Sequence, residues 1–308
     1  MKQPVLFLIF NSTETSIKVF QQIKDYKPSE IFISADGGRD EIEHKSCEDL
    51  RELILSQIDW DCKIHKNFYS MNQGCQKAVS GGINWFFQNV NSGIILEDDC
   101  LPINGFFDFC EAMLEHYKDD DCVMHITGTA MSQMSDNPNE YFFSISPNIW
   151  GWATWRRAWE KYQINLNDIN PASFKIKLKD FGFNDHMISH ILYRLRFTKK
   201  HPHYTWDYKW SIVNYLNLGL TIHPAKNLIL NIGFDQNATN TFKMPTYYNT
   251  LTSSDGFQFI EKKEAKMNWK YFNDIAPDIY KKGTWNFLKK ELWCLSPKLM
   301  KYLLRKFS

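Results

Sequence analysis

Ile94-Ile95-Leu96-Glu97-Asp98-Asp99-Cys100 is the stretch of sequence from which the fold is best inferred. Its three apolar residues predict a short strand buried on both faces. Three acidic residues follow at the carboxyl end of that strand, the edge at which open α/β sheets bind their ligands. Adjacent carboxylates repel one another unless a cation or hydrogen-bond donors compensate, and hard oxygen ligands favour Mg²⁺ or Mn²⁺. The stretch therefore predicts a ligand site with a divalent metal or, alternatively, a solvated acidic turn.

The first 126 residues alternate between strand and helix patterns on either side of this stretch. The strands are predicted at 5–10, 31–34, 63–69, 94–96 and 123–126. The helices are predicted from Ser12 to about Tyr26 and along apolar stripes at 50–58, 79–90 and 106–117. This alternation predicts an α/β fold with a mostly parallel, doubly wound sheet.

From about residue 140 the pattern changes to loops rich in aromatic residues, at 141–143 and 150–155. Helices are predicted near 172–179, 185–197 and 211–217, a strand at 220–224 and a last helical segment at 255–308. We interpret the second half as an extension of the same domain.

Composition excludes several classes of protein. The 308 residues carry 36 Lys+Arg against 35 Asp+Glu, so the net charge gives no argument for nucleic-acid binding. The seven cysteines contain no C-x-x-C pair and predict reduced thiols. Because the amino-terminal apolar run is too short for a signal peptide and no run approaches a membrane span, we expect a cytoplasmic protein.

The carboxyl-terminal residues 281–308 hold eight basic residues and one acidic residue, together with Trp and Leu at helical spacing. This is the composition of a helix that lies on an anionic membrane surface, such as the inner face of the cell membrane. A helix packed on the domain is the alternative interpretation.

Other motifs argue against competing chemistries. No G-x-G-x-x-G follows the first strand, and no Walker loop is present. His186 and His190 have the spacing of a zinc pair but lack the glutamate of the metalloprotease motif. Adjacent carboxylates cannot flank a glycosidic bond from opposite sides, so a glycoside hydrolase is not predicted.

Several blocks in order along the chain resemble those of the GT-A fold glycosyltransferases, in particular the N-acetylglucosaminyltransferase I group and its bacterial relatives. The first four blocks are Phe10-Asn11, Ser34-Ala35-Asp36-Gly37, Asn72-Gln73-Gly74-Cys75 with Ile83-Asn84-Trp85-Phe86-Phe87, and Glu97-Asp98-Asp99. Two further blocks resemble the bacterial relatives, namely 150–155 and Asn231-Ile232-Gly233-Phe234-Asp235. The resemblance covers roughly residues 4–240.

The resemblance implies an enzyme that transfers a hexosyl or N-acetylhexosaminyl group from a nucleotide-diphosphate sugar, such as UDP-GlcNAc, to a glycan or lipid-linked saccharide. A role in cell-surface polysaccharide biosynthesis would follow. It also implies a GT-A domain at 1–254, with a nucleotide-binding half (1–126) and an acceptor-side half (127–254), and a basic helical segment at 255–308.

The resemblance also implies roles for individual residues. Asp99 would bind Mn²⁺ or Mg²⁺, which bridges the donor phosphates. The donor nucleotide would be bound by Asn11, Ser34, Asp36, Gly37, Asn72, Gly74, Glu97 and Asp98. The substrate pocket would contain Trp150, Gly151, Trp152, Asn231, Gly233, Asp235 and Asn240. The tryptophans have a second interpretation, in which they are buried in the core.

Asp207 is the candidate general base of an inverting displacement. Trp206-Asp207 with Trp210 resembles the W-D-D-W stretch that carries the base in the N-acetylglucosaminyltransferase I group, although this chain has a single Asp there. The alternative is that Asp207 caps a helix, because Asp is a favoured N-cap residue.

Two positions depart from the family pattern. Ser12 stands where relatives often have Arg, so a positive charge near the donor phosphates would have to come from elsewhere, for instance Arg39. Asn240 stands where relatives often have His. These departures keep two alternatives open: a sugar nucleotidyltransferase, or a catalytically inactive sugar-binding protein of the same fold.

Overall fold

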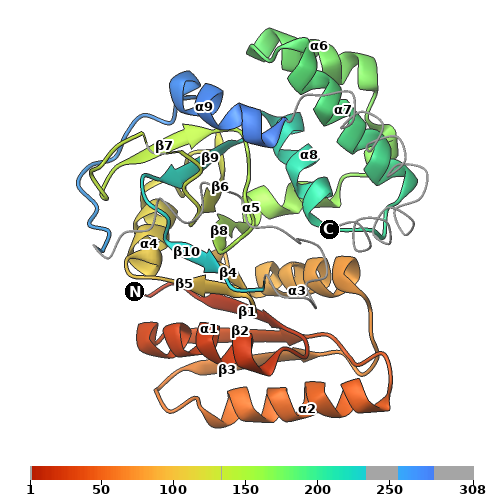
Figure 1. Ribbon diagram of the computed structural model, residues 1–308, viewed down its shortest axis with the longest axis vertical. Helices are drawn as coiled ribbons and strands as arrows, with labels where there is room; N and C mark the ends of the chain where they lie inside the picture. The colour runs from red at the N-terminus through yellow and green to blue at the C-terminus, as the bar shows by residue number, and fades with distance from the viewer. Residues whose placement is uncertain (1, 133, 234–255, 281–308) are drawn as a thin grey trace, which may run out of the picture.

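An eight-stranded sheet forms the centre of the computed structural model, which describes residues 2–132, 134–233 and 256–280 (Figure 1). The strands lie in the order β3-β2-β1-β4-β8-β6-β9-β7. Their bounds are β1 Val5–Ile9, β2 Glu30–Ala35, β3 Lys63–Phe68, β4 Ser92–Glu97, β6 Val123–Thr127, β7 Tyr141–Ser144, β8 Trp152–Trp155 and β9 Leu220–Pro224. A separate two-stranded sheet joins β5 (Cys100–Pro102) to β10 (Ile229–Asn231).

The sheet is mostly parallel. β1 pairs in parallel with β2 and β4, β2 with β3, and β6 with β9. The exceptions are β8, antiparallel to both β4 and β6, and β7, antiparallel to β9. The predicted α/β class with a mostly parallel, doubly wound sheet is confirmed.

The strand order reverses between β1 and β4. From β1 the chain proceeds through β2 to β3 on one side, and then returns to place β4 on the other side of β1. Crossover helices leaving in opposite directions open a crevice at the carboxyl ends of such a strand pair. The acidic residues 97–99 follow β4 at that end.

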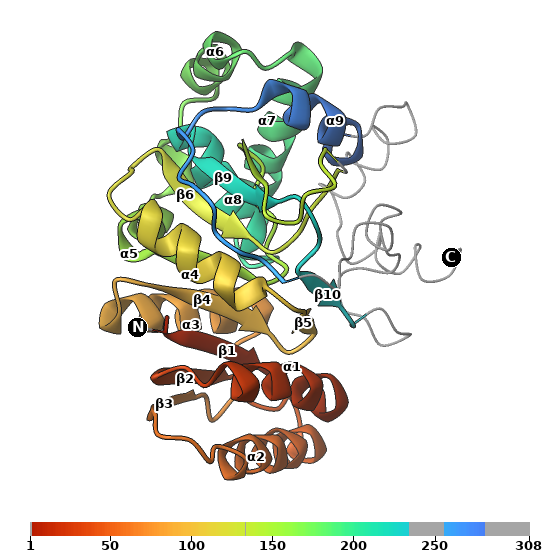
Figure 2. The same ribbon diagram turned by 90° about the vertical axis from the view of Figure 1, so that its left-hand side faces the viewer.

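Helices cover both faces of the sheet (Figure 2). Their bounds are α1 Thr13–Tyr26, α2 Glu41–Ser56, α3 Cys75–Asn89, α4 Phe106–His116, α5 Arg156–Trp159, α6 Pro171–Phe181, α7 Asp185–Lys200, α8 Asp207–Asn217 and α9 Trp269–Ile279. Two short 3₁₀ helices occupy Glu160–Gln163 and Leu166–Asp168. Because side chains alternate along β1, Phe7 belongs to a core that includes residues of α1, α2 and α4, whereas Leu6 belongs to a core that includes residues of α3 and α8.

A second apolar core lies among α6, α7, α8 and α9 and includes Phe142 of β7. Ile191 of α7, Ile212 of α8 and Phe272 of α9 are fully buried there. This core fixes α7 and α8 against the acceptor-side half of the sheet and so determines where the start of α8 lies.

Two aromatic stretches that the sequence assigned to loops are strands. Tyr141–Ser144 is β7, and Trp152–Trp155 is β8, which is inserted antiparallel between β4 and β6. Every residue of both strands is buried, so neither shows the polar–apolar alternation by which a half-exposed strand is recognised. The helices and strands predicted in the first 126 residues are all present, with bounds shifted by a few residues except in α2, which begins at Glu41.

The predicted carboxyl-terminal helical segment is helical over α9, but residues 256–268 contain no helix. They run across the protein surface, and Phe257 packs on Phe109 of α4 with ring centroids 5.0 Å apart. Residues 281–308 lie outside the described residues. The division of the chain at residue 254 remains a prediction.

No helix within the described ranges is long and apolar enough to cross a membrane. The six cysteines in those ranges are free thiols.

Candidate functional site

The acidic triplet lies where the sequence predicts it. Glu97 ends β4, and Asp98 and Asp99 form the turn that leads into β5. All three side chains are half-buried. The carboxylate of Asp98 accepts a hydrogen bond of 3.2 Å from the backbone N–H of Phe10, which follows β1. This hydrogen bond links the ends of β1 and β4, the two strands between which the strand order reverses; we call this position the β1/β4 switch point.

The environment of the triplet disfavours its charged form. Burial raises the pKa of Glu97 well above its ordinary value, and the charges of Asp99, Asp98 and Asp207 raise it further. Burial and the neighbouring Asp99 raise the pKa of Asp98 to about 7. Within the described residues no Lys or Arg forms an ion pair with any of the three. A bound cation would therefore relieve an unfavourable concentration of negative charge.

Asp99 is held by hydrogen bonds from neighbouring residues, beside a glycine that leaves room for a small cation. Its backbone carbonyl accepts a 2.8 Å hydrogen bond from Ile232, and its carboxylate receives hydrogen bonds from Cys100 and from the side chain of Asn231. A Cβ atom on Gly233 would lie 2.5 Å from its Oδ2, so only glycine leaves room beside the carboxylate.

The residues present fit Mn²⁺ or Mg²⁺. In the described part of the chain no three His, Cys, Asp or Glu side chains are grouped so as to hold a metal by themselves. These ions are commonly bound by one or two carboxylates, with the remaining ligands supplied by water and substrate phosphates. The carboxylate of Asp99 is a hard oxygen donor of that kind, whereas the amide oxygen of Asn231 accepts a hydrogen bond of 2.9 Å from the backbone N–H of Gly233.

Asp36 follows β2 and connects two loops of the nucleotide-binding half. Its carboxylate accepts hydrogen bonds from the backbone N–H groups of Gly37 (2.9 Å), Gln73 (2.7 Å) and Gly74 (3.1 Å), and from the side chain of Asn72 (3.1 Å). Asp36 is only 8% exposed. Its carboxylate is thus engaged by the protein itself and fixes the loop that precedes α3 beside the loop that follows β2.

Asn11 belongs to a second cluster, between the loops that follow β1 and β2. Its side chain donates to Glu43 (2.8 Å), and the Arg39 side chain donates to the same carboxylate (2.7 Å from Nε). The hydrogen bonds from Arg39 hold the pKa of Glu43 below its usual range. Arg39, considered above as a substitute for a charge missing at Ser12, is therefore already paired.

Ser34 is buried near the carboxyl end of β2. It is 3% exposed, and its hydroxyl accepts a hydrogen bond from Asn67 at 3.1 Å. A Cβ atom on Gly82 of α3 would lie 2.7 Å from the same hydroxyl. The position of Ser34 indicates a role in the close packing of β2 on α3 rather than direct contact with a ligand.

The tryptophan block separates into two environments. Ile95 of β4 pairs with Trp152 of β8, so the residues that precede β8 lie beside the carboxyl end of β4. Trp150 is half-buried there, and Gly151 has a φ of +58°, which glycine tolerates best. Trp152 is fully buried, and its ring centroid lies 5.7 Å from that of Trp206. This position agrees with the second interpretation of the tryptophans, in which they are buried in the core.

Asp207 is the first residue of α8, and Trp206 occupies the N-cap position, so Asp207 is not the cap residue. The Thr205 hydroxyl donates to its carboxylate. Burial raises the pKa of Asp207, an effect that the Thr205 hydrogen bond and the charge of Arg194 oppose. Trp206, the residue before Asp207, packs on Trp152, which pairs with Ile95 of β4. The start of α8 therefore lies near β4, and the charge of Asp207 contributes to the raised pKa of Glu97.

Several residues around Asp207 were not predicted. Tyr162 is almost fully buried, and its hydroxyl donates to the backbone oxygen of Trp206 at 3.3 Å. Lys209 lies over the Tyr162 ring at 4.5 Å, and Arg194 lies over the Tyr208 ring at 5.0 Å. Tyr208, two residues after Trp206, was the available sequence signal for these contacts, because aromatic rings often bind cations.

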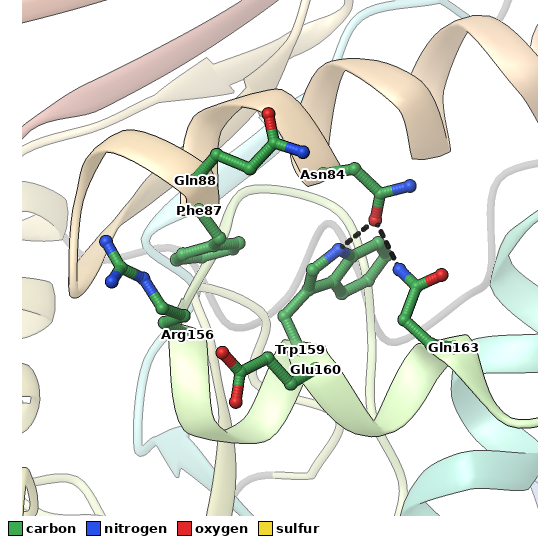
Figure 3. A pocket seen from close by; sticks show the side chains of 7 residues that line it. All are labelled: Asn84, Phe87, Gln88, Arg156, Trp159, Glu160 and Gln163. Carbon is green, nitrogen blue, oxygen red and sulfur yellow. Dashed lines mark hydrogen bonds between the residues drawn. The ribbon is translucent and has the colours of Figure 1, made fainter.

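A groove of about 470 Å³ lies at the opposite end of β4 (Figure 3). The Asn84 side-chain oxygen accepts hydrogen bonds there from Trp159 (2.8 Å) and Gln163 (2.9 Å). Arg156, which lines the groove, donates to the carbonyl of Val90, just before β4 begins. The groove is therefore at the amino edge of the strand and is separate from the acidic triplet.

Two predicted pocket residues, Asp235 and Asn240, and the Phe234 of the same block lie outside the described residues. Of the remainder, the fold brings Asn231 and Gly233 to Asp99, and Trp150 and Gly151 to the end of β4. Asn72, Gly74 and Gly37 each donate a hydrogen bond to the carboxylate of Asp36.

No family model matches the sequence, and no curated protein matches it. Three solved structures illustrate its structural likenesses. HddC from Yersinia pseudotuberculosis has a TM-score of 0.34 and 11% identity, over 53% of this chain and 80% of that one. The mannosyltransferase PcManGT from Pyrobaculum calidifontis, in complex with GDP-Man and Mn²⁺, has a TM-score of 0.35 and 12% identity, over 58% and 52%.

The third, GalNAc-T7 with UDP, GalNAc and Mn²⁺, has a TM-score of 0.43 and 10% identity, over 73% of this chain and 43% of that one. The matched regions thus span about half or less of the mannosyltransferase and GalNAc-T7 chains. With TM-scores below 0.5, these likenesses by themselves establish neither a common fold nor a common activity.

Proposed function

We propose that this protein is a GT-A glycosyltransferase that moves a sugar from a nucleotide-diphosphate donor, UDP-linked and of the UDP-GlcNAc type, to a glycan or lipid-linked saccharide. One observation carries the proposal: an uncompensated acidic triplet ends β4 beside the β1/β4 switch point, where α/β sheets bind nucleotides. Residues of four blocks that resemble this enzyme family follow the carboxyl ends of strands: Asn11 follows β1, Asp36 follows β2, Asn72 follows β3, and Asp98 follows β4.

The donor nucleotide would lie across the carboxyl ends of β1, β2 and β4. Asn11 and Asp98 lie at the ends of β1 and β4, and Asn72 and Gly74 lie on the loop fixed by Asp36. Asp36 would act through these loops, because its carboxylate already accepts four hydrogen bonds.

Asp99 would hold Mn²⁺ or Mg²⁺ in the space that Gly233 leaves free, and the side chain of Asn231 would orient its carboxylate by a hydrogen bond. The metal would neutralise charge that develops on the departing nucleoside diphosphate. Glu97 and Asp98 would then be less strongly disfavoured in their charged forms, because the cation offsets their mutual repulsion.

Asp207 would take the proton from the acceptor hydroxyl in an inverting displacement. Its half-buried position limits solvation of the carboxylate, and burial raises its pKa toward the range in which a carboxylate acts as a base. The half-buried Trp150 at the end of β4 would offer its indole to a saccharide ring.

Donor binding and nucleotide release test the proposal together. We expect UDP to bind in calorimetry with Mn²⁺ and to bind at least tenfold more weakly when EDTA removes the metal. In a panel of UDP-, GDP- and CMP-sugars, one donor should release its nucleotide faster when a saccharide acceptor is added. Pyrophosphate-dependent release of a nucleoside triphosphate would instead identify a nucleotidyltransferase.

Asp99→Asn should abolish the Mn²⁺-dependent part of UDP binding, whereas Asp119→Asn, a change at an exposed acidic residue, should not. Metal-dependent binding that survives in the Asp99 variant would refute the assignment of Asp99. Binding without release from any donor would indicate a sugar-binding protein that lacks activity.

The setting of the enzyme is also a proposal. Cell-surface polysaccharide biosynthesis in the cytoplasm would bring the protein to lipid-linked acceptors, and the basic residues 281–308 would contact anionic lipid. The test is flotation with anionic liposomes of the full chain and of a chain that ends at Gly283. Equal flotation of the two would reject the membrane contact.

A further inference from the structure

Arg194 of α7 lies within a group of tyrosines close to Asp207. Its guanidinium carbon is 5.0 Å from the centre of the Tyr208 ring. Tyr215 of α8 and Tyr280, which follows α9, are linked through their hydroxyls at 2.8 Å, and both act on the charge of Arg194. The side chain is half-buried, and the neighbouring tyrosines come from α8 and from the residue that follows α9.

Among residues 2–132, 134–233 and 256–280 this guanidinium forms no hydrogen bond and no ion pair, although the charge of nearby Asp207 contributes to raising its pKa. The arginines at 39, 51, 156 and 157, by contrast, each donate to a carboxylate or a backbone carbonyl. An enclosed arginine with five N–H donors is costly unless something accepts from it. Arg194 is half-buried rather than fully buried, so part of its side chain remains exposed to solvent.

Arg194 lies next to the proposed base. Its guanidinium carbon is 5.0 Å from the ring centre of Tyr208, the residue that follows Asp207 at the start of α8. The charge of Arg194 also lowers the pKa of Asp207. An anionic group bound at Arg194 would therefore lie close to the hydroxyl that Asp207 is proposed to deprotonate.

We propose that Arg194 binds an anionic group, a carboxylate or a phosphate, carried by the acceptor saccharide. The inference rests on the proposed transferase function, in which the acceptor hydroxyl lies at Asp207. A guanidinium presents paired N–H donors that match a carboxylate or phosphate. The Arg194 guanidinium lies over the ring of Tyr208 at 5.0 Å, and the hydrogen-bonded hydroxyls of Tyr215 and Tyr280 influence its charge.

The donor diphosphate is the other source of the same chemistry, and the experiment separates the two. The full-length protein is titrated with UDP in the presence of Mn²⁺ and, separately, with methyl glucuronide, glucose 6-phosphate and methyl glucoside as probes. The variants are Arg194→Gln, Arg194→Lys and, as a matched control, Arg196→Gln, an exposed arginine on the same helix.

We expect the wild-type protein and Arg196→Gln to prefer at least one acidic saccharide over methyl glucoside by about tenfold or more, the range expected of a charge-assisted pair. Arg194→Gln should lose this preference and Arg194→Lys should keep part of it, while UDP affinity stays unchanged in all three variants.

Two results would overturn the proposal. One is a wild-type protein without any preference for the acidic saccharides. The other is an Arg194→Gln variant that loses UDP affinity in the same proportion as saccharide affinity, which would assign Arg194 to the donor phosphates. Failure of the transferase proposal itself is recognised separately, as absence of Mn²⁺-dependent UDP binding in the wild-type protein.

Discussion

Asp207 combines burial, a raised pKa and closeness to Glu97, and these properties support a role in proton transfer. We predict that Asp207→Asn binds a UDP-sugar with wild-type affinity but transfers the sugar 10²–10⁴-fold more slowly, roughly the value of a positioned general base. The carboxamide preserves the shape of the side chain, so a kinetic defect without a binding defect would reflect the lost base.

The matched control is Asp185→Asn, because Asp185 is an exposed aspartate at the first position of the neighbouring helix α7. Calorimetry measures donor binding, and the rate of product formation measures transfer. Near-wild-type transfer by the Asp207 variant, or a product that retains the anomeric configuration, would mean that Asp207 is not the base.

Asp36 is the residue whose role changed most between sequence and structure. The resemblance assigned it to the nucleotide, but four donors from two loops converge on its carboxylate. We predict that Asp36→Ala lowers the free energy of unfolding by about 2–5 kcal/mol, because it leaves backbone N–H groups without an acceptor. Asp36→Asn retains one acceptor oxygen and should lose less.

Urea denaturation measures this difference, with Asp49→Ala as a control that removes an exposed ion pair of α2 and should cost about 1 kcal/mol or less. A loss of nucleotide binding without any loss of stability in Asp36→Ala would support direct contact with the nucleotide instead.

At the scale of single residues, the sequence revealed the chemistry that is contiguous in the chain. The triplet at 97–99 could be found because three acidic residues follow an apolar run. The roles of Asp36 and Arg194 could not, because they depend on partners that the fold brings from elsewhere: residues 72–74 for Asp36, and Tyr215 and Tyr280 for Arg194.

At the scale of elements, the helices and strands that were predicted correctly are those with a clear hydrophobic pattern. The amphipathic helices and buried strands of the first half were predictable, because each has the period of its own element. β8 was not predictable: its partners β4 and β6 come from distant parts of the sequence, and all four of its residues are buried. Residues 256–268 were assigned to a helix, yet they are held by contacts with α4 and β7 and by no hydrogen-bond pattern of their own.

Two tyrosines fasten that segment to the domain. The hydroxyl of Tyr117 donates to the backbone oxygen of Lys263 at 2.7 Å, and the backbone N–H of Lys263 donates to the hydroxyl of Tyr141, also at 2.7 Å. The two hydroxyls are 2.7 Å apart and hydrogen-bond to each other. We define Tyr117, Tyr141 and Lys263 as the tyrosine clasp.

We predict that the double variant Tyr117→Phe/Tyr141→Phe is less stable than wild type by about 2–4 kcal/mol, because the backbone of Lys263 loses its partners while the rings remain. Protease cleavage within 256–268 should become faster. Tyr69→Phe is the control, because the Tyr69 hydroxyl makes no hydrogen bond within the described residues. Unchanged stability together with unchanged cleavage would show that ring packing alone holds the segment.

At the scale of the whole molecule, two sets of buried titratable groups respond to acid in opposite ways. Glu97, Asp98 and Asp207 have raised pKa values in the folded protein, so the folded state gains protons as the pH falls and is stabilised relative to the unfolded chain. His125 and His223 have lowered pKa values, about 3 and about 4, because burial disfavours their charged forms. The site and the core therefore make opposing contributions to acid stability.

The two histidines are buried as neutral hydrogen-bonding groups. His125 accepts from the indole of Trp210 at 3.1 Å, and its other ring nitrogen lies 2.8 Å from the carbonyl of Asn148. His223 lies 2.8 Å from the hydroxyl of Ser144. Their positions in the core could not be predicted from sequence, because an isolated histidine in an apolar strand shows no sign of its partners.

We predict that His223→Gln and His125→Gln reduce the dependence of stability on pH. Between pH 6.5 and about 4 the unfolded chain binds a proton at each histidine and the folded protein does not, so stability falls with pH by up to about 1.4 kcal/mol per unit for each histidine. A variant that lacks one histidine lacks one such contribution. Its deficit relative to wild type, measured by urea denaturation at pH 8, should therefore shrink as the pH is lowered to 5. His203→Gln, at an exposed loop residue, should show no such convergence. A deficit that stays constant from pH 8 to pH 5 would show that these histidines do not contribute to the acid response, and that the carboxylates of the site dominate it.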